Sequence, residues 1–209
     1  APPVGMRVAG LMSHLGFANE AGDPRTEVQL AVFDDACEGL DYPRSIANSG
    51  GLLHTSDAHL DWVRPGILLY GVSPLGEAMP ELRPAMTLAA PVISVKQVRA
   101  GDTVGYGGRY RARRDVWIAI IAAGYGDGYP ATVKNGTPVL IRGRRYGIAG
   151  AVSMDMCCCE LGLETSVKEG DEAVLWGPGL PLEDVAGMNE LNPYVLPTQL
   201  TSRVRRETH

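Results

Sequence analysis

The sequence predicts an α/β segment followed by a mainly antiparallel β domain. Between residue 1 and about residue 75, short apolar runs alternate with runs of helical character, whereas beyond that point apolar runs are separated by glycine-containing turns. Pro74, Pro80 and Pro84, with Gly76 among them, mark a linker between the two patterns. We therefore expect one domain over residues 1–80 and a second over residues 81–209.

The first domain shows repeated β/α units. Asp23 followed by Pro24 is typical of a helix N-cap and first helical residue, and Gly39 is a suitable stop. Such repeats indicate a parallel sheet, whose functional loops follow the carboxyl ends of the strands. The other expected elements are a buried strand over residues 8–13, a short strand over 45–47, a polar turn over 48–51, a short helix over 52–54, and a strand, turn and helix start over 62–71.

The second domain is predicted to be mainly antiparallel. Gly-Asp at residues 101–102 and 170–171 and Asn-Gly at residues 135–136 are typical hairpin turns. Helices are expected only over residues 182–189 and near Thr198. The expected strands cover residues 86–98, 104–110, 116–122, 139–142, 147–161 and 172–176.

Composition narrows the class of protein. The 209 residues carry a net charge of -5, which disfavours nucleic acid as a partner, although the arginine-rich run over residues 109–114 could still attract phosphate. The longest apolar run, residues 116–123, is far shorter than the roughly 20 residues that span a bilayer. We expect a cytoplasmic protein without a membrane partner.

The cysteines suggest neither a disulfide framework nor a metal site. Cys37 stands alone and residues 157–159 are three consecutive cysteines, which is not the spacing of metal ligands. On a strand the three would alternate between faces, so we expect about two of them to be buried, reduced thiols. No metal is expected elsewhere.

Two glycine-containing turns could bind a phosphate. Ser49 lies in an Ala-Asn-Ser-Gly-Gly run at residues 47–51, and Gly66-Ile67 follows Arg64-Pro65. A hydroxyl and outward-pointing backbone N–H groups are the donors that a phosphate needs. On this ground alone, ordinary β/α turns are the favoured interpretation.

Tyr106 lies in the glycine-rich run over residues 105–108, which would let its ring stand free and face another surface. Tyrosine can act as an acid or base when positive charge lies nearby, but on spacing alone a purely structural tyrosine is favoured. His14 ends an apolar strand, where a buried core histidine is favoured over a catalytic one. Residues 124–130 and 153–156 form two further loops, at strand ends.

Taken in order, these motifs resemble bacterial alanine racemase, a pyridoxal-phosphate enzyme. The resemblance runs nearly from end to end. The matching stretches are residues 10–14 (GLMSH), 47–51 (ANSGG), 63–71 (VRPGILLYG), 101–107 (GDTVGYG), 124–130 (GYGDGYP), 152–156 (VSMDM) and 201–204 (TSRV).

The resemblance implies an N-terminal (β/α)8 TIM-type barrel followed by a β domain, in a head-to-tail homodimer whose active sites combine both subunits. This chain would then carry the last β/α units of the barrel and the whole β domain. The family's Schiff-base lysine would belong to a segment before Ala1, because Lys96, Lys134 and Lys168 lie in other motifs. The chain by itself is therefore expected to be inactive.

The resemblance also assigns cofactor-binding residues. Ser49, Gly66, Ile67 and Tyr194 would bind the phosphate of pyridoxal 5'-phosphate, and Arg64 would face its pyridine nitrogen. A guanidinium cannot give up its proton at ordinary pH, so the ring nitrogen would stay unprotonated. That arrangement favours return of a proton to the α-carbon over side reactions.

Catalytic and substrate-binding roles follow from the same resemblance. Tyr106 would be one of two bases, presented across the dimer, and His14 would hydrogen-bond both that tyrosine and Arg64. Met154, through its backbone N–H, and Asp155 would lie beside the substrate carboxylate. Tyr125 would narrow the entrance.

The expected function is racemisation of L- and D-alanine, supplying D-alanine for peptidoglycan. Another fold-related pyridoxal-phosphate enzyme, either a broad-specificity racemase or an amino-acid decarboxylase, is the first alternative, although the Gly-Pro-Thr-Cys setting of those decarboxylases is not found. The second alternative is a non-catalytic β module that docks on a separate barrel protein.

Overall fold

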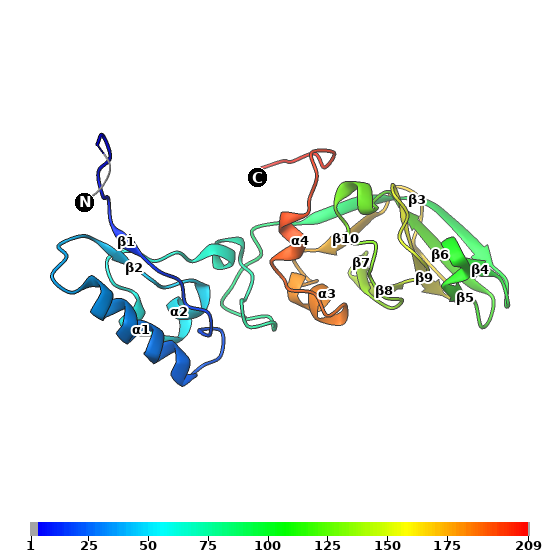
Figure 1. Cartoon of the computed structure of the whole chain (residues 1–209). Helices are drawn as coiled ribbons and strands as arrows, with labels where there is room; N and C mark the ends of the chain where they lie inside the picture. The colour runs from blue at the N-terminus through cyan, green and yellow to red at the C-terminus, as the bar shows by residue number, and fades with distance from the viewer. Residues whose placement is uncertain (1–3, 209) are drawn as a thin grey trace. The chain divides into compact units, whose positions relative to one another are not determined.

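The computed structural model describes residues 4–208 and separates into two compact units that divide between Leu75 and Gly76. Figure 1 shows the helices α1 and α2 in the first unit and most of the strands in the second. None of the helices within the described residues is long and apolar enough to cross a membrane.

Over residues 4–75, the first unit contains one parallel strand pair flanked by helices. β1 (Leu11–Met12) pairs with β2 (Arg44–Ser45), and α1 (Pro24–Cys37) connects them in a β/α/β order. The expected buried strand over residues 8–13 is wrong in length and burial, because Met12 is exposed and β1 pairs with one strand only. The parallel β/α pattern itself is confirmed.

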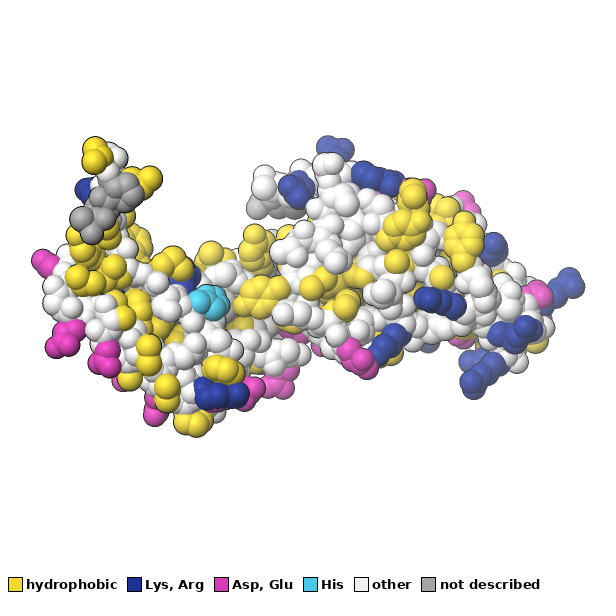
Figure 2. Space-filling view, viewed as in Figure 1, with side chains coloured by type: hydrophobic (Ala, Val, Ile, Leu, Met, Phe, Trp, Pro, Cys, Tyr) yellow, Lys and Arg dark blue, Asp and Glu magenta, His cyan; other side chains and the backbone are white. Residues whose placement is uncertain are grey.

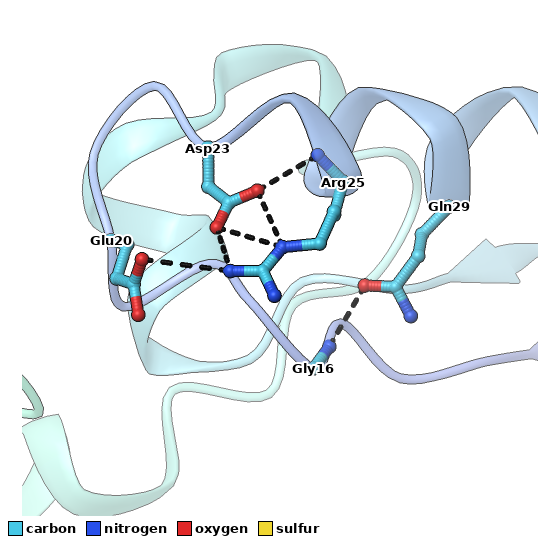
Figure 3. Close-up of polar contacts among 5 residues, drawn as sticks. All are labelled: Gly16, Glu20, Asp23, Arg25 and Gln29. Carbon is cyan, nitrogen blue, oxygen red and sulfur yellow. Dashed lines mark hydrogen bonds and ion pairs between the residues drawn. The ribbon is translucent and has the colours of Figure 1, made fainter.

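The start of α1 agrees with the sequence prediction and is shown in Figure 3. The Asp23 carboxylate accepts from the Arg25 backbone N–H at 2.9 Å and also binds its guanidinium. The hydrogen bonds from Arg25 and its positive charge lower the pKa of Asp23 to about 2. Gln29 Oε1 accepts from the Gly16 backbone N–H at 2.9 Å, which ties the helix to the loop after β1.

The core of the first unit is small. Phe33 and Cys37, one turn apart on α1, belong to a buried cluster with Leu15 and Ile46 from the segments next to β1 and β2. Trp62, at the start of the segment over residues 62–71 that is expected to open with a strand, is 67% exposed. Its backbone joins the end of β2 through a single bridge to Ser45, so its side chain has no facing layer within this unit.

The predicted polar turn over residues 48–51 is instead the start of α2 (Ser49–His54). Asn48 caps this helix, since its side-chain oxygen accepts from the Gly51 N–H at 3.0 Å. Gly50 and Gly51 are buried, and a Cβ at Gly50 would lie 2.6 Å from the Ala18 carbonyl oxygen. These glycines therefore allow close packing of α2 rather than a turn. Beyond it lie η1 (Ser56–Ala58) and η2 (Gly66–Tyr70).

The second unit is built on a closed antiparallel barrel, in the order β10-β3-β6-β9-β8-β7. This confirms the predicted antiparallel domain and adds its closure, which removes every exposed strand edge from that sheet. The strands are β3 (Leu88–Val98), β6 (Val116–Ile121), β7 (Pro138–Ile141), β8 (Arg144–Ile148), β9 (Cys157–Gly162) and β10 (Glu172–Trp176).

Two predicted strands are corrected by the structure. The run over residues 104–110 is interrupted, because β4 (Thr103–Val104) and β5 (Tyr110–Arg111) pair with each other around η3 (Tyr106–Gly108). The run over residues 147–161 is divided between β8 and β9 by a loop. In both places glycines with positive φ, such as Gly107 and Gly150, bend the backbone away from a strand.

Alternation along β9 sorts its side chains between the barrel core and the outer face. Cys157, Cys159 and Leu161 are buried inside, whereas Cys158 and Glu160 point outward and are partly exposed. All cysteines are free, as expected for reduced thiols. Around this barrel lie η4 (Tyr125–Asp127), α3 (Leu182–Met188) and α4 (Val195–Thr198).

Candidate functional site

The first unit brings His14 and Arg64 together, as the resemblance implies. Arg64 Nη2 lies 3.4 Å from His14 Nδ1 and donates to the Ser13 carbonyl oxygen at 2.6 Å. Arg64 Nη1 donates to Ser45 Oγ at 2.6 Å. The guanidinium is thus held at the carboxyl ends of the parallel strands β1 and β2, where an α/β sheet presents its functional groups.

His14 is exposed and has a second neighbour. Its Nε2 lies 3.3 Å from Asn48 Nδ2, whose side chain also donates to the Leu15 carbonyl oxygen at 2.8 Å. Because Arg64 and this amide nitrogen are both donors, a neutral imidazole can accept from only one of them. The packing fixes the ring at the rim of the sheet, and the expectation of a buried core histidine is not met.

The two glycine-containing turns meet at Ser49. Ser49 is buried at the start of α2, and its hydroxyl donates to the Pro65 carbonyl oxygen. Gly66 opens η2 with φ +47°, and a Cβ placed on it would lie 3.5 Å from Ser49 Oγ. A glycine here leaves free the space beside the hydroxyl. The first N–H groups of η2, at Gly66 and Ile67, have no carbonyl partner inside that turn.

In the second unit, Tyr106 is displayed as the sequence predicts. Its side chain is 76% exposed on η3, between Gly105 and Gly107, whose φ angles are +75° and +67°. A Cβ on Gly105 would lie 2.8 Å from the Ala151 backbone nitrogen, so the loop packs too closely for any other residue there. The ring consequently stands clear of its neighbours.

Tyr106 borders a depression of about 530 Å³ that also contains Met154 and Asp155. Met154 is 51% exposed. Cys158 lies in the wall, and its burial raises the pKa of its thiol, although the charge of nearby Lys96 lowers that pKa. Because its pKa is raised overall, the Cys158 thiol stays protonated at neutral pH, and we interpret it as a residue that lines the depression.

Tyr125 is joined to the Met154 loop by the backbone. The Tyr125 N–H donates to the Ser153 carbonyl oxygen at 3.0 Å, and the Gly126 N–H donates to the Met154 carbonyl oxygen at 2.8 Å. A Cβ on Gly124 would overlap the backbone of this loop. The lack of side chains at the glycines of residues 124–128 therefore allows the two loops to come into direct contact.

Tyr194 lies at the N-cap of α4 and is 37% exposed. Its carbonyl oxygen accepts from Thr198 Oγ1 at 2.8 Å. Downstream of α4, the Thr201 N–H donates to the Asp127 carbonyl oxygen at 3.1 Å, which connects this terminal segment to the Tyr125 loop. The sequence predictions assign no role to Asp127 or Arg203. The only sign of their importance in the sequence is that each lies in one of the stretches that match the family, residues 124–130 and 201–204.

The arginine-rich run forms a separate feature. Arg111, Arg113 and Arg114 line a cleft of about 470 Å³ together with Tyr110 and Glu160. The Tyr110 hydroxyl donates to Glu160 Oε2 at 2.7 Å, and burial together with this carboxylate raises the pKa of Tyr110 to about 12. The cleft combines cationic groups with a fixed phenol–carboxylate pair, and none of the residues assigned by the resemblance lines it.

Comparison with known proteins gives two family matches. The family model described as alanine racemase, C-terminal domain, matches residues 85–208, and that described as alanine racemase, N-terminal domain, matches residues 3–74. The biosynthetic alanine racemase of Escherichia coli strain K12 is 48% identical over 198 residues, which cover 93% of this chain and 55% of that protein. The chain thus spans about half the length of the curated relatives that it matches.

Solved structures that resemble this chain are also alanine racemases. The biosynthetic alanine racemase of Pseudomonas aeruginosa aligns with a TM-score of 0.89 at 43% identity, covering 96% of this chain and 57% of that one. Alanine racemase from Bartonella henselae, described with covalently bound pyridoxal phosphate, aligns with a TM-score of 0.88 at 34% identity, covering 96% of this chain and 56% of that one.

Proposed function

The chain belongs to the alanine racemase family, and we propose that the protein containing it interconverts L- and D-alanine with pyridoxal 5'-phosphate. The observation that carries the proposal is the occurrence, in one chain, of two complementary features. The first unit holds donors suited to a phosphate around Ser49 and Gly66. The second unit displays an exposed tyrosine, Tyr106, beside a depression large enough for a small substrate.

The donors around Ser49 fit the phosphate of the cofactor. Ser49 can rotate its hydroxyl away from the Pro65 carbonyl oxygen, and the Gly66 and Ile67 N–H groups lie at the start of a helical turn. The missing Cβ at Gly66 leaves room next to that hydroxyl. Tyr194 is the further phosphate ligand that we propose from the second unit.

Arg64 is the proposed partner of the pyridine nitrogen. Its guanidinium is anchored by the Ser13 carbonyl oxygen and by Ser45 Oγ, both at 2.6 Å, so that its position is fixed before any ligand binds. The cofactor, when bound, draws electrons from the α-carbon of the amino acid and thereby acidifies its α-hydrogen. An arginine facing the ring limits that withdrawal, which favours reprotonation of the α-carbon.

Racemisation requires a proton to leave one face of the α-carbon and another to arrive on the opposite face, so two groups must act as acid and base. We propose Tyr106 as one of them, with its hydroxyl oxygen moving the proton. The exposure of Tyr106 suits a residue that completes the site of a second subunit in a head-to-tail homodimer. The second base would be a lysine from a part of the protein that this chain does not span.

The Met154 backbone N–H and the Asp155 loop would orient the substrate carboxylate, and Tyr125 would narrow the entrance. These residues belong to loops that are hydrogen-bonded to each other. In the proposed homodimer, His14, next to Arg64, would hydrogen-bond the phenol of the partner's Tyr106 and hold it in position. We propose that the D-alanine produced serves peptidoglycan synthesis in the cytoplasm.

The experiment that tests this function uses the full-length protein loaded with pyridoxal 5'-phosphate and supplied with pure L-alanine. We expect D-alanine to form until the enantiomers are equal, and, because enantiomers have equal free energies, kcat/KM should be the same in both directions. An amino-acid decarboxylase would instead release carbon dioxide and an amine. Absence of any turnover and of cofactor binding would support the non-catalytic module.

A further inference from the structure

Arg203 connects the two loops that carry the proposed substrate-binding residues. Its Nη2 lies 2.6 Å from Asp155 Oδ1, and its Nε lies 3.4 Å from Asp127 Oδ1. Asp127 ends η4, the turn that begins with Tyr125, and Asp155 follows Met154. One guanidinium therefore spans both loops from the C-terminal segment.

The surrounding backbone is shaped around this arginine. A Cβ on Gly126 would overlap Arg203 Nη1 and would lie 2.9 Å from the Met154 carbonyl oxygen, so a larger residue there would displace the guanidinium from its present position over the loop. Thr201 Oγ1 donates to the Gly126 carbonyl oxygen at 2.8 Å, which fixes the segment from which Arg203 extends. The arginine is thus held on the loops by contacts on both sides of it.

The charges of Arg203, Asp127 and Asp155 would affect the binding of a substrate carboxylate. Asp155 is 59% exposed at its side chain and borders the same depression as Tyr106. An unpaired carboxylate at that place would repel the carboxylate of an amino acid. The hydrogen bond that Arg203 donates to Asp155, together with the negative charge of Asp127, raises the pKa of Arg203, which therefore stays positively charged. Asp127 is held separately, since its Oδ2 accepts from the Gly124 N–H at 2.9 Å.

We propose that Arg203 is a positioning residue for substrate binding: it neutralises Asp155 and holds the Met154 and Tyr125 loops together, so that the depression beside Tyr106 accepts a monocarboxylate amino acid. This inference rests on the proposed racemase function and adds a residue to it. Arg203 acts through Asp155 and is not itself in the proton-transfer chemistry.

The test compares Arg203→Met with the double variant Arg203→Met/Asp155→Asn in the full-length, cofactor-loaded protein. Arg205→Met is the matched control, because Arg205 is a nearby exposed arginine that pairs with Glu207 at 2.9 Å rather than with either loop. KM and kcat for L- and D-alanine, the cofactor absorbance and the thermal unfolding midpoint are measured for each variant.

We expect Arg203→Met to raise KM about tenfold, the size of effect that one uncompensated charge near the substrate produces in a partly solvated site, while kcat changes less. The added Asp155→Asn should restore most of the lost affinity, because it removes the charge that Arg203 neutralises. Cofactor absorbance and the Arg205→Met control should match the parent protein.

Three outcomes would overturn the inference while leaving the proposed function standing. In the first, Arg203→Met racemises alanine as well as Arg205→Met does. In the second, kcat and the unfolding midpoint fall with KM unchanged. In the third, the double variant shows no recovery. Failure of the parent protein to racemise alanine would instead overturn the proposed function itself.

Discussion

The two units of the chain differ in how completely each buries its own apolar surface. In the second unit, the six barrel strands each pair on both sides, and among its described residues Tyr106 is the one large apolar or aromatic side chain that is more than 60% exposed. Within residues 4–75, the first unit has one strand pair, and seven such side chains exceed that exposure: Val4, Met6, Met12, Val28, Val32, Trp62 and Leu69. Figure 2 shows hydrophobic side chains in yellow on the surface of the molecule.

This difference in exposed apolar side chains parallels the difference between the two sheets, one closed and one of two strands. A closed barrel has no unpaired edge, so it needs no further strand to complete its sheet. The exposure of Tyr106 on η3 follows from the glycines on either side of it, which have positive φ angles. A two-stranded sheet is marginal on its own and needs further strands or helices on its apolar faces. The exposed side chains of the first unit are therefore consistent with a surface that further barrel elements would cover, as we propose for a (β/α)8 barrel.

The largest expected effect distinguishes proton transfer, which we assign to the second unit, from cofactor binding, for which the first unit supplies most of the proposed ligands. Tyr106→Phe in the full-length protein should lower kcat for racemisation by about 10²- to 10⁴-fold, since it removes a general acid–base group from the second unit. Cofactor absorbance should be unchanged, because Tyr106 is not among the proposed cofactor ligands. Steady-state kinetics in both directions provide the measurement. Near-parental turnover would remove Tyr106 from the two-base assignment and break this division of roles.

A core truncation tests whether the two units unfold independently. Ile118 is fully buried on β6, and Ile118→Ala should destabilise the barrel by about 2–5 kcal/mol. Hydrogen exchange should show this loss across the barrel strands, while amides of α1 exchange as in the parent chain. Equal loss of protection in both units would show that they unfold as one cooperative block.

A milder effect is expected in the phosphate-binding turn of the first unit. Ser49→Ala should weaken cofactor affinity by about tenfold, the value of roughly one hydrogen bond to a charged group. Ser56→Ala is the control, because Ser56 is an exposed serine whose hydroxyl donates to Asp57 Oδ1 at 3.3 Å. The measurement is titration of the apoprotein with pyridoxal 5'-phosphate. Equal affinities for the two variants would exclude Ser49 as a ligand.

The smallest effect concerns the cap of α1. Because the pKa of Asp23 is lowered to about 2 from 3.8, its ionised form stabilises the fold above about pH 4, and that contribution is lost as the pH falls towards 2. Asp23→Asn keeps a good N-cap but not the charge, so its first unit should lack this pH dependence. The measurement is hydrogen exchange of the α1 amides at several pH values. Identical pH profiles of exchange for the parent protein and Asp23→Asn would contradict this prediction.

The sequence by itself determined the local features that depend on neighbouring residues. Asp23-Pro24 predicted the start of α1, the Gly-Asp and Asn-Gly turns predicted the antiparallel domain, and the glycines around Tyr106 predicted an exposed ring. The order of its motifs indicated the family. These signals are local because capping, φ preferences and strand alternation are set within a few residues.

Tertiary structure alone decided how distant segments meet. Residues 49–51 form the first turn of α2 because buried glycines allow this helix to pack against Ala18, although the sequence is typical of a polar turn. Closure of the barrel depends on β10 pairing with both β3 and β7, and the cluster of Arg203, Asp127 and Asp155 joins three separate loops. Such contacts arise from long-range packing, which no short window of sequence encodes.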